Sequence, residues 1–195
     1  MENYLKYLKE YLYPLRNYIF LACLIFVFAI FYGYSVAQTS PEEVKTMLDG
    51  IKKVYEPVFE MSPIAQFLFV VLNNGLTLLF IILLGLVFGI PPFMALLSNG
   101  AVLGIVAFFS KQTFSWSVFF LGTLPHGIIE IPVLILGCAV GLKIGKTLFN
   151  KVFKKQGEVK KELSLALDFF LKALLPLLAI AAAIEIFITA NLLGV

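Results

Sequence analysis

The chain has 195 residues, of which 61% are hydrophobic and 14% are charged, and its formal net charge is +3. Soluble globular proteins carry about 45–50% apolar and about 25% charged residues, so this composition excludes an ordinary soluble domain. It indicates an integral membrane protein, and we expect residues 1–195 to form one membrane domain. Because the net charge is modest, its distribution along the chain is more informative than its sum.

A helix needs about 20 mostly apolar residues to cross a bilayer, and five apolar segments have about this length or more. They are residues 17–37, 64–90, 92–109, 128–149 and 169–193. A helical structure is expected because a lone strand cannot satisfy its backbone hydrogen bonds in lipid. The sequence therefore predicts an all-α, polytopic transmembrane helical bundle with about five spans.

Basic residues predict the orientation of these spans. They concentrate before the first span and around the connection 150–168, whereas the first connection is acidic on balance. With the N-terminus inside, eleven of the 15 Lys and Arg residues face the cytoplasm, as the positive-inside rule requires. We expect a multi-pass protein of the cytoplasmic membrane, with a cytoplasmic N-terminus and an extracytoplasmic C-terminus.

The acidic first connection, residues 39–62, has the pattern of an amphipathic helix. Pro41, Glu42 and Glu43 favour a helix start, and apolar residues recur at helical spacing from Val44 to Tyr55. This extracytoplasmic helix is expected to pack on its own bundle, to lie on the membrane surface or to hold a partner. The basic connection 150–168 is expected to contact anionic lipid headgroups. No aromatic platform accompanies its lysines, which argues against nucleic acid as a partner.

An ionisable pair lies within the fourth apolar region. His126 and Glu130 are the only ionisable residues between positions 114 and 142, and such groups are costly at membrane depth. Their spacing places both on one helical face. Pro125 and Gly127 flank the histidine and predict a break in the helix. We expect a short outer or re-entrant helix before Pro125, and a long helix that begins near it.

Other polar residues occur in the remaining spans. Asn73 and Asn74 lie in the second span, Asn99 in the third and Glu185 in the fifth. Counting residues along the spans places Asn73 and Glu185 at mid-membrane or in the outer half. We expect these groups to converge with His126 and Glu130 on one buried polar cluster that is open toward the outside. Intramembrane amides also serve as interhelical hydrogen-bonding groups, which is the structural alternative.

Glycines recur every fourth residue after this pair, at Gly137, Gly141 and Gly145. Such small-xxx-small patterns let another helix backbone approach closely. The same spacing occurs at Gly85 and Gly89, and at Gly100 and Gly104. These stripes predict a tightly packed bundle, and they allow a homodimer without requiring one.

The segment PHGIIEIP, together with NNG in the second span and SNGAVLG in the third, resembles the stage II sporulation protein M family. In spore-forming bacteria the family member belongs to an engulfment complex with two partners that degrade peptidoglycan. The resemblance therefore implies a membrane scaffold that recruits protein partners and has no catalytic activity. Its signature residues map onto Asn73, Asn74, Asn99, Gly100, Pro125, His126, Gly127 and Glu130.

Three functions are consistent with these patterns. The first is the non-enzymatic scaffold. The alternative is a channel or transporter for an ion or small solute, because broken helices and midplane polar groups build transporter sites; His126 and Glu130 would form the site. A metal-dependent intramembrane hydrolase is favoured least, because an H-x-x-x-E pair supplies at most two metal ligands. We expect no catalytic set, metal or cofactor, and Cys23 and Cys138 act as small apolar residues.

Overall fold

The structure is a computed structural model that describes residues 2–113 and 116–189, and this part of the chain is almost entirely helical, without strands. Five helical segments in it are long and apolar enough to cross a membrane. They are Tyr4–Thr39, Pro63–Leu86, Ile90–Gln112, Gly127–Lys154 and Val159–Ile188. The predicted all-α bundle with about five spans is confirmed. Side chains are described except at residues 2, 3, 52, 113, 117–119, 121–126 and 189.

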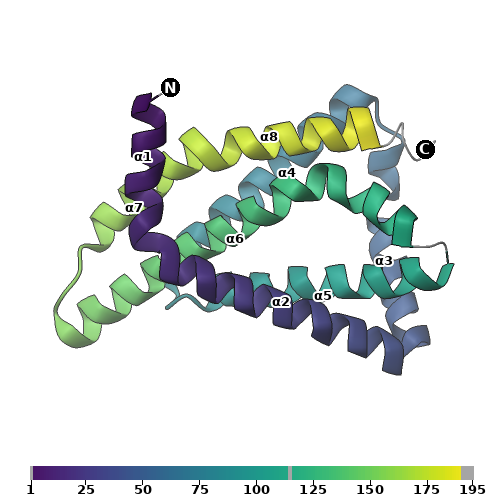
Figure 1. The fold of residues 1–195 in the computed structure, drawn as a ribbon, viewed down its shortest axis with the longest axis horizontal. Coiled ribbons are helices and arrows are strands. Elements are labelled where there is room, and N and C mark those ends of the chain that lie inside the picture. Colours follow the sequence, from purple (N-terminus) through teal and green to yellow (C-terminus); the bar gives the residue numbers. More distant parts are fainter. Residues whose placement is uncertain (1, 114–115, 190–195) are drawn as a thin grey trace.

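Eight α-helices with short 3-10 and π turns follow one another along the described chain (Figure 1). Helix α2 packs along α5, and α6 lies centrally, in contact with α2, α4, α5 and α8. Pro176 lies just after a π turn that joins α7 to α8. Such a turn lets the helix continue past a residue that has no backbone N–H. The helices are α1 Glu2–Leu12, α2 Arg16–Thr39, α3 Pro41–Phe59, α4 Pro63–Leu83, α5 Ile90–Thr113, α6 Trp116–Lys154, α7 Val159–Phe169 and α8 Leu175–Ile184.

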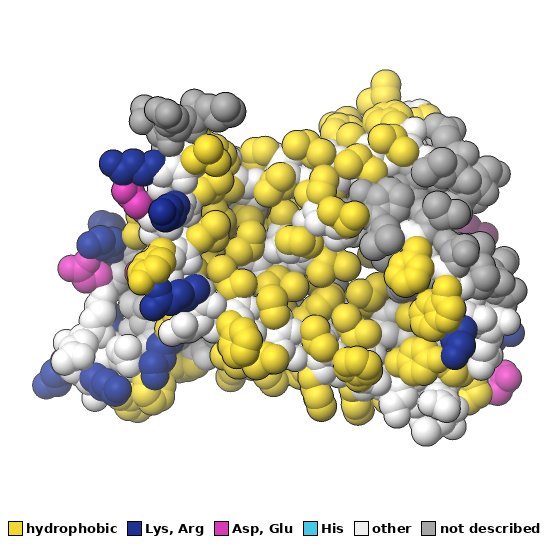
Figure 2. Space-filling view, viewed as in Figure 1, with side chains coloured by type: hydrophobic (Ala, Val, Ile, Leu, Met, Phe, Trp, Pro, Cys, Tyr) yellow, Lys and Arg dark blue, Asp and Glu magenta, His cyan; other side chains and the backbone are white. Residues whose placement is uncertain are grey.

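Two helices run across the ends of the bundle instead of along it (Figure 1). Helix α1 crosses one end, near the connection between α6 and α7, and α3 crosses the opposite end. In Figure 2 most of the visible Lys and Arg side chains gather at the first end, and a broad hydrophobic surface separates the two ends. We call the first the lysine-rich end and the second the α3 end. Both basic segments of the sequence therefore lie on one side of the apolar zone.

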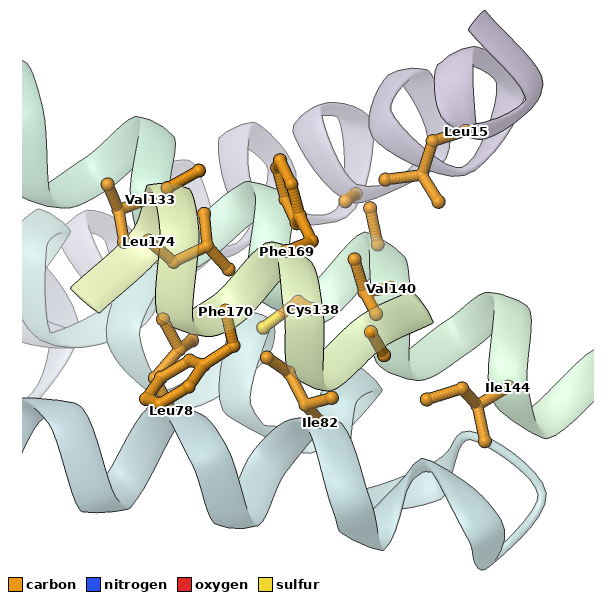
Figure 3. Packing of buried hydrophobic residues seen from close by; sticks show 14 of the residues in the cluster. Leu15, Leu78, Ile82, Val133, Cys138, Val140, Ile144, Phe169, Phe170 and Leu174 are labelled. Atoms are coloured by element: carbon orange, nitrogen blue, oxygen red, sulfur yellow. The ribbon is translucent and has the colours of Figure 1, made fainter. Parts of the chain in front are cut away.

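The core of the bundle forms around α6 (Figure 3). Cys138 is fully buried and unpaired, as expected of a small apolar residue. Phe169 and Leu174 cover it from the fifth span, and Ile82 approaches from α4. Each of these side chains is at most 1% exposed, so this part of the interior is closely packed.

Helix α6 corrects the predicted break. The segment before Pro125 is helical, as expected, but it does not form a separate helix, because α6 runs continuously from Trp116 to Lys154. The ribbon of α6 instead bends in its N-terminal part (Figure 1). A proline inside a helix removes one backbone hydrogen bond, and this often bends the helix without ending it. The side chains of Pro125 and His126 lie outside the described residues.

Helix α1 was not predicted, and aromatic contacts hold it on the bundle. The Tyr11 and Phe169 rings stack with their centroids 4.3 Å apart. The Tyr7 hydroxyl donates a hydrogen bond of 2.9 Å to the Asp168 carboxylate, which also pairs with Lys172. The N-terminal segment is therefore fastened to the start of the fifth span.

Candidate functional site

A hydrogen bond between two membrane-spanning helices marks the polar site. The Asn74 side-chain amide of α4 donates to Glu130 Oε1 of α6 over 2.9 Å, and both side chains are partly buried. The two residues are 56 positions apart in sequence. Gly75, next to Asn74, and Leu78, one turn further along α4, are buried, so this side of α4 faces the bundle. Asn73 extends the pair, since its amide donates to Asn74 Oδ1 over 3.4 Å.

Two cavities meet at this hydrogen bond. The first, of about 300 Å³, lies between α4, α5 and α6, and the second, of about 250 Å³, reaches α3 and the last helical turn. Asn74 and Glu130 line both cavities. Glu185 and Asn73 line the second cavity, whereas Asn99 and Gly127 line the first. The cluster expected from the sequence is thus distributed over two adjoining spaces.

The predicted site residues differ in how closely they come together. Asn74 and Glu130 are in direct contact. Asn99 lines the same cavity, but its amide donates to the Ala95 carbonyl of its own helix over 2.9 Å. Glu185 is partly buried where its cavity borders Glu130. The side chain of His126 lies outside the described residues, so its predicted pairing with Glu130 stays a prediction.

Glycine contacts close the bundle on the lysine-rich side of this site. Along α6, Gly137 and Gly145 lie about 10 and 22 Å beyond Glu130 toward that end. A Cβ atom on Gly141 would be 2.5 Å from Pro92 Cγ, and one on Gly145 would collide with the Gly89 backbone. Gly89 has φ +78°, which favours glycine in the reversal between α4 and α5. The glycine contacts at Gly141 and Gly145 therefore lie on the lysine-rich side of Glu130.

Two further glycines of the predicted signature, Gly100 and Gly137, also sit at close contacts. A Cβ atom on Gly100 of α5 would lie 2.7 Å from the Phe26 carbonyl oxygen of α2. A Cβ atom on Gly137 would collide with the Leu78 side chain of α4. Gly127 is buried beside the first cavity. Gly100 thus brings the α5 and α2 backbones together, as small residues do in membrane bundles.

Sequence reasoning missed two polar residues that line the cavities. Thr77 lines the first cavity, and it lies three positions after Asn74, on the same helical face. Gln66 lines the second cavity, where its amide donates to the Phe59 and Met61 carbonyls and holds the turn between α3 and α4. Helical spacing from Asn74 is the signal by which Thr77 could have been found.

The chemistry of the site is set by a few polar side chains in a mostly apolar wall. Carboxylates and amides line it, and Lys and Arg are absent from the described residues around both cavities. Within the described chain, no group of three or more His, Cys, Asp or Glu residues is placed to hold a metal ion. The carboxylates and amides of this arrangement can donate and accept hydrogen bonds with a polar group.

Known proteins give two points of comparison. The sequence model of the family described as Stage II sporulation protein M matches residues 22–190. An uncharacterized protein of the archaeon Methanocaldococcus jannaschii is 30% identical over 123 residues, which cover 61% of this chain and 68% of the archaeal protein. No solved structure matches the chain significantly.

Proposed function

The chain belongs to the stage II sporulation protein M family, and on this premise we propose that it is a non-enzymatic membrane scaffold that recruits a protein partner through α3. The observation that carries the proposal is the apolar surface of α3, which its own bundle covers only in part. Val44 is 7% exposed, in a small core with Ala37, Ile105 and Phe108. Val54, three turns further along α3, is 73% exposed.

The uncovered part of α3 forms a continuous stripe. Met47, Ile51 and Val54 recur at helical spacing, and all three are exposed. Asp49 and Glu56 lie on the opposite face of the helix, which therefore keeps its amphipathic character outside the bundle. Contiguous apolar surface rimmed by polar residues is typical of an interaction site. The sequence-based expectation that α3 packs on its own bundle therefore describes its N-terminal part only.

Site-specific photo-crosslinking tests this proposal in native membranes. A photoreactive residue at position 54 should give a discrete protein adduct, and mass spectrometry would identify the partner. The same residue at Lys53, which faces away from the stripe, is the matched control and should give no such adduct. Adducts with lipid alone from position 54 would overturn the scaffold proposal.

A second candidate function is passage of a small solute or ion. It is favoured by the two cavities that meet at Asn74 and Glu130, since transporters place polar sites near the midplane. Purified protein in proteoliposomes should then show a flux that Glu130→Gln abolishes. Flux no greater than that of empty vesicles, for protons, alkali cations and amines, would reject this function and leave the scaffold proposal intact.

A further inference from the structure

A further cavity lies at the junction of α2, α3 and α5, and we infer that it binds the phosphate group of an anionic phospholipid. The cavity measures about 610 Å³, which is within the range of small-molecule sites. Its wall comes from the end of α2, the first two turns of α3 and the end of α5. None of its lining residues borders the cavities at Glu130, so the inference is independent of both proposed functions.

The position of this cavity matches the level of lipid headgroups. The membrane-spanning segments Tyr4–Thr39 and Ile90–Gln112 both end beside it, and α3 crosses this end of the bundle (Figure 1). Gln38 of α2 and Gln112 of α5 line the cavity. Phe31 is 71% exposed, and it lies two turns before Gln38 on the same face of α2. The acyl chains of a bound lipid would therefore meet an apolar surface next to the cavity.

The charge of the lining favours an anion. Four lysines lie in α3 and at the end of α5, and two of them, Lys45 and Lys111, line the cavity from different helices. Glu42 also lines it, so the lining has a net charge of +1 at pH 7. Neither lysine forms a salt bridge with a described carboxylate. Lys111 instead lies over the Trp116 ring, with its Nζ atom 5.8 Å from the ring centroid. A positive lining of this kind attracts anions to the cavity.

The hydrogen-bond donors of the lining match a phosphate group. Each lysine ammonium has three N–H donors, and each glutamine amide has two. Lys45 and Lys111 can approach a phosphate from two helices, since lysine binds phosphate as a point charge. Gln38 and Gln112 can donate to its remaining oxygens. A carboxylate has only two oxygens to share among these donors, so the lining suits a phosphate better.

Aromatic side chains form an ordered floor for the cavity. Phe108 is 6% exposed and packs in the small core that contains Ala37 and Val44. The rings of Tyr34 and Phe108 meet edge to face, with centroids 5.4 Å apart, and Phe108 contacts Phe109 in the same way at 5.3 Å. All three rings line the cavity. Aromatic residues that carry a polar group are common at membrane–water interfaces, so Tyr34 fits the headgroup level assigned to the cavity.

Quenching of Trp116 fluorescence tests this inference on the full chain in phosphatidylcholine nanodiscs. Trp116 is the sole tryptophan of the chain and lies beside Lys111, so its fluorescence reports lipid near this cavity and not at the lysine-rich end. Brominated phosphatidylglycerol should quench it saturably, and at a lower mole fraction than brominated phosphatidylcholine or brominated diacylglycerol. Lys45→Gln should weaken binding of phosphatidylglycerol by about tenfold, because it removes a charge-assisted hydrogen bond. Lys53→Gln removes the same charge from α3 outside the cavity, and it should behave like the wild type.

Three outcomes would overturn the inference. Equal quenching by the three brominated lipids would show that the cavity does not recognise the headgroup. Equal loss in Lys45→Gln and Lys53→Gln would show that surface charge alone attracts the lipid. Displacement of the lipid by an equal concentration of sn-glycerol 3-phosphate would assign the cavity to a soluble phosphate ester. If Lys45→Gln does not fold, Lys111→Gln replaces it, and comparing the brominated lipids within that variant cancels any change in the brightness of Trp116.

Discussion

Single residues decide how the bundle holds a carboxylate at membrane depth. Glu130 accepts a hydrogen bond from Asn74 across two helices, and interhelical bonds of this type contribute about 0.6–2 kcal/mol. The sequence predicted that these residues would converge on a polar cluster, because both are polar and lie at similar depth. It did not predict which asparagine faces Glu130, since adjacent residues on a helix point about 100° apart and only packing sets the rotation.

A double-mutant cycle between Asn74→Ala and Glu130→Ala should show a coupling of about 1 kcal/mol in unfolding free energy, because the two side chains share one hydrogen bond. Unfolding in mixed detergent micelles provides the measurement. The matched cycle pairs Asn73→Ala with Glu130→Ala, and its coupling should be smaller, because Asn73 donates to Asn74 and not to Glu130. Additive effects in the first cycle would contradict the assigned bond.

Glycine substitutions should separate the packed interior from the free surface. Gly141→Ala places a Cβ atom 2.5 Å from Pro92 Cγ, and overpacking of this kind costs about 1–3 kcal/mol. Gly50→Ala meets no atom within 4 Å on α3, so it should stabilise the helix by about 0.5–1 kcal/mol. The same unfolding assay compares the two variants. A Gly141→Ala protein as stable as Gly50→Ala would show that the α6 contact is loose.

At the scale of elements, the long apolar runs were predictable and the surface helices were only partly so. The five spans follow from composition, since each run must cross the bilayer. Helix α1 was missed because its apolar residues cover one face of a short segment, and Tyr11 gains its partner Phe169 only after folding. The bend in α6 was mistaken for a break because a proline signal does not tell whether neighbouring helices keep the helix continuous.

Docking of α1 should depend on the aromatic contact. Tyr11→Ala removes the ring stacked on Phe169, so α1 should separate from the bundle more often. Limited proteolysis of the purified protein should then cut residues 2–12 faster than in the wild type. Tyr13→Ala is the control, because this ring is 65% exposed. Equal cleavage of all three proteins would mean that the stack does not hold α1.

At the scale of the whole molecule, both basic segments lie at one end, and the second cavity reaches α3 at the other. The positive-inside rule then predicts that the lysine-rich end is cytoplasmic. Helix α3 supplies the exposed stripe and part of the second cavity wall. We therefore expect a partner bound to α3 to sit beside the second cavity.

Cysteine labelling in intact cells tests the orientation. In a chain with Cys23 and Cys138 replaced by Ala, a cysteine at Asp49 should react with a membrane-impermeant maleimide from outside. A cysteine at Gln156, in the connection after α6, should react only after the cells are permeabilised. The reverse pattern would place the lysine-rich end outside.

The central structural claim is a polar site between α4 and α6 at Asn74 and Glu130, lined by a first cavity that Thr77 also borders and by a second that reaches α3. Its most direct test is the reactivity of Thr77→Cys, on the cavity wall, in a cysteine-free chain reconstituted in lipid. We predict that the cationic reagent aminoethyl methanethiosulfonate modifies this cysteine much faster than the anionic sulfonatoethyl reagent. The neighbouring Leu76→Cys lies on the outer surface of the bundle, where lipid would cover it, and should stay unmodified. Equal rates with both reagents, or no reaction at Thr77→Cys, would contradict the account.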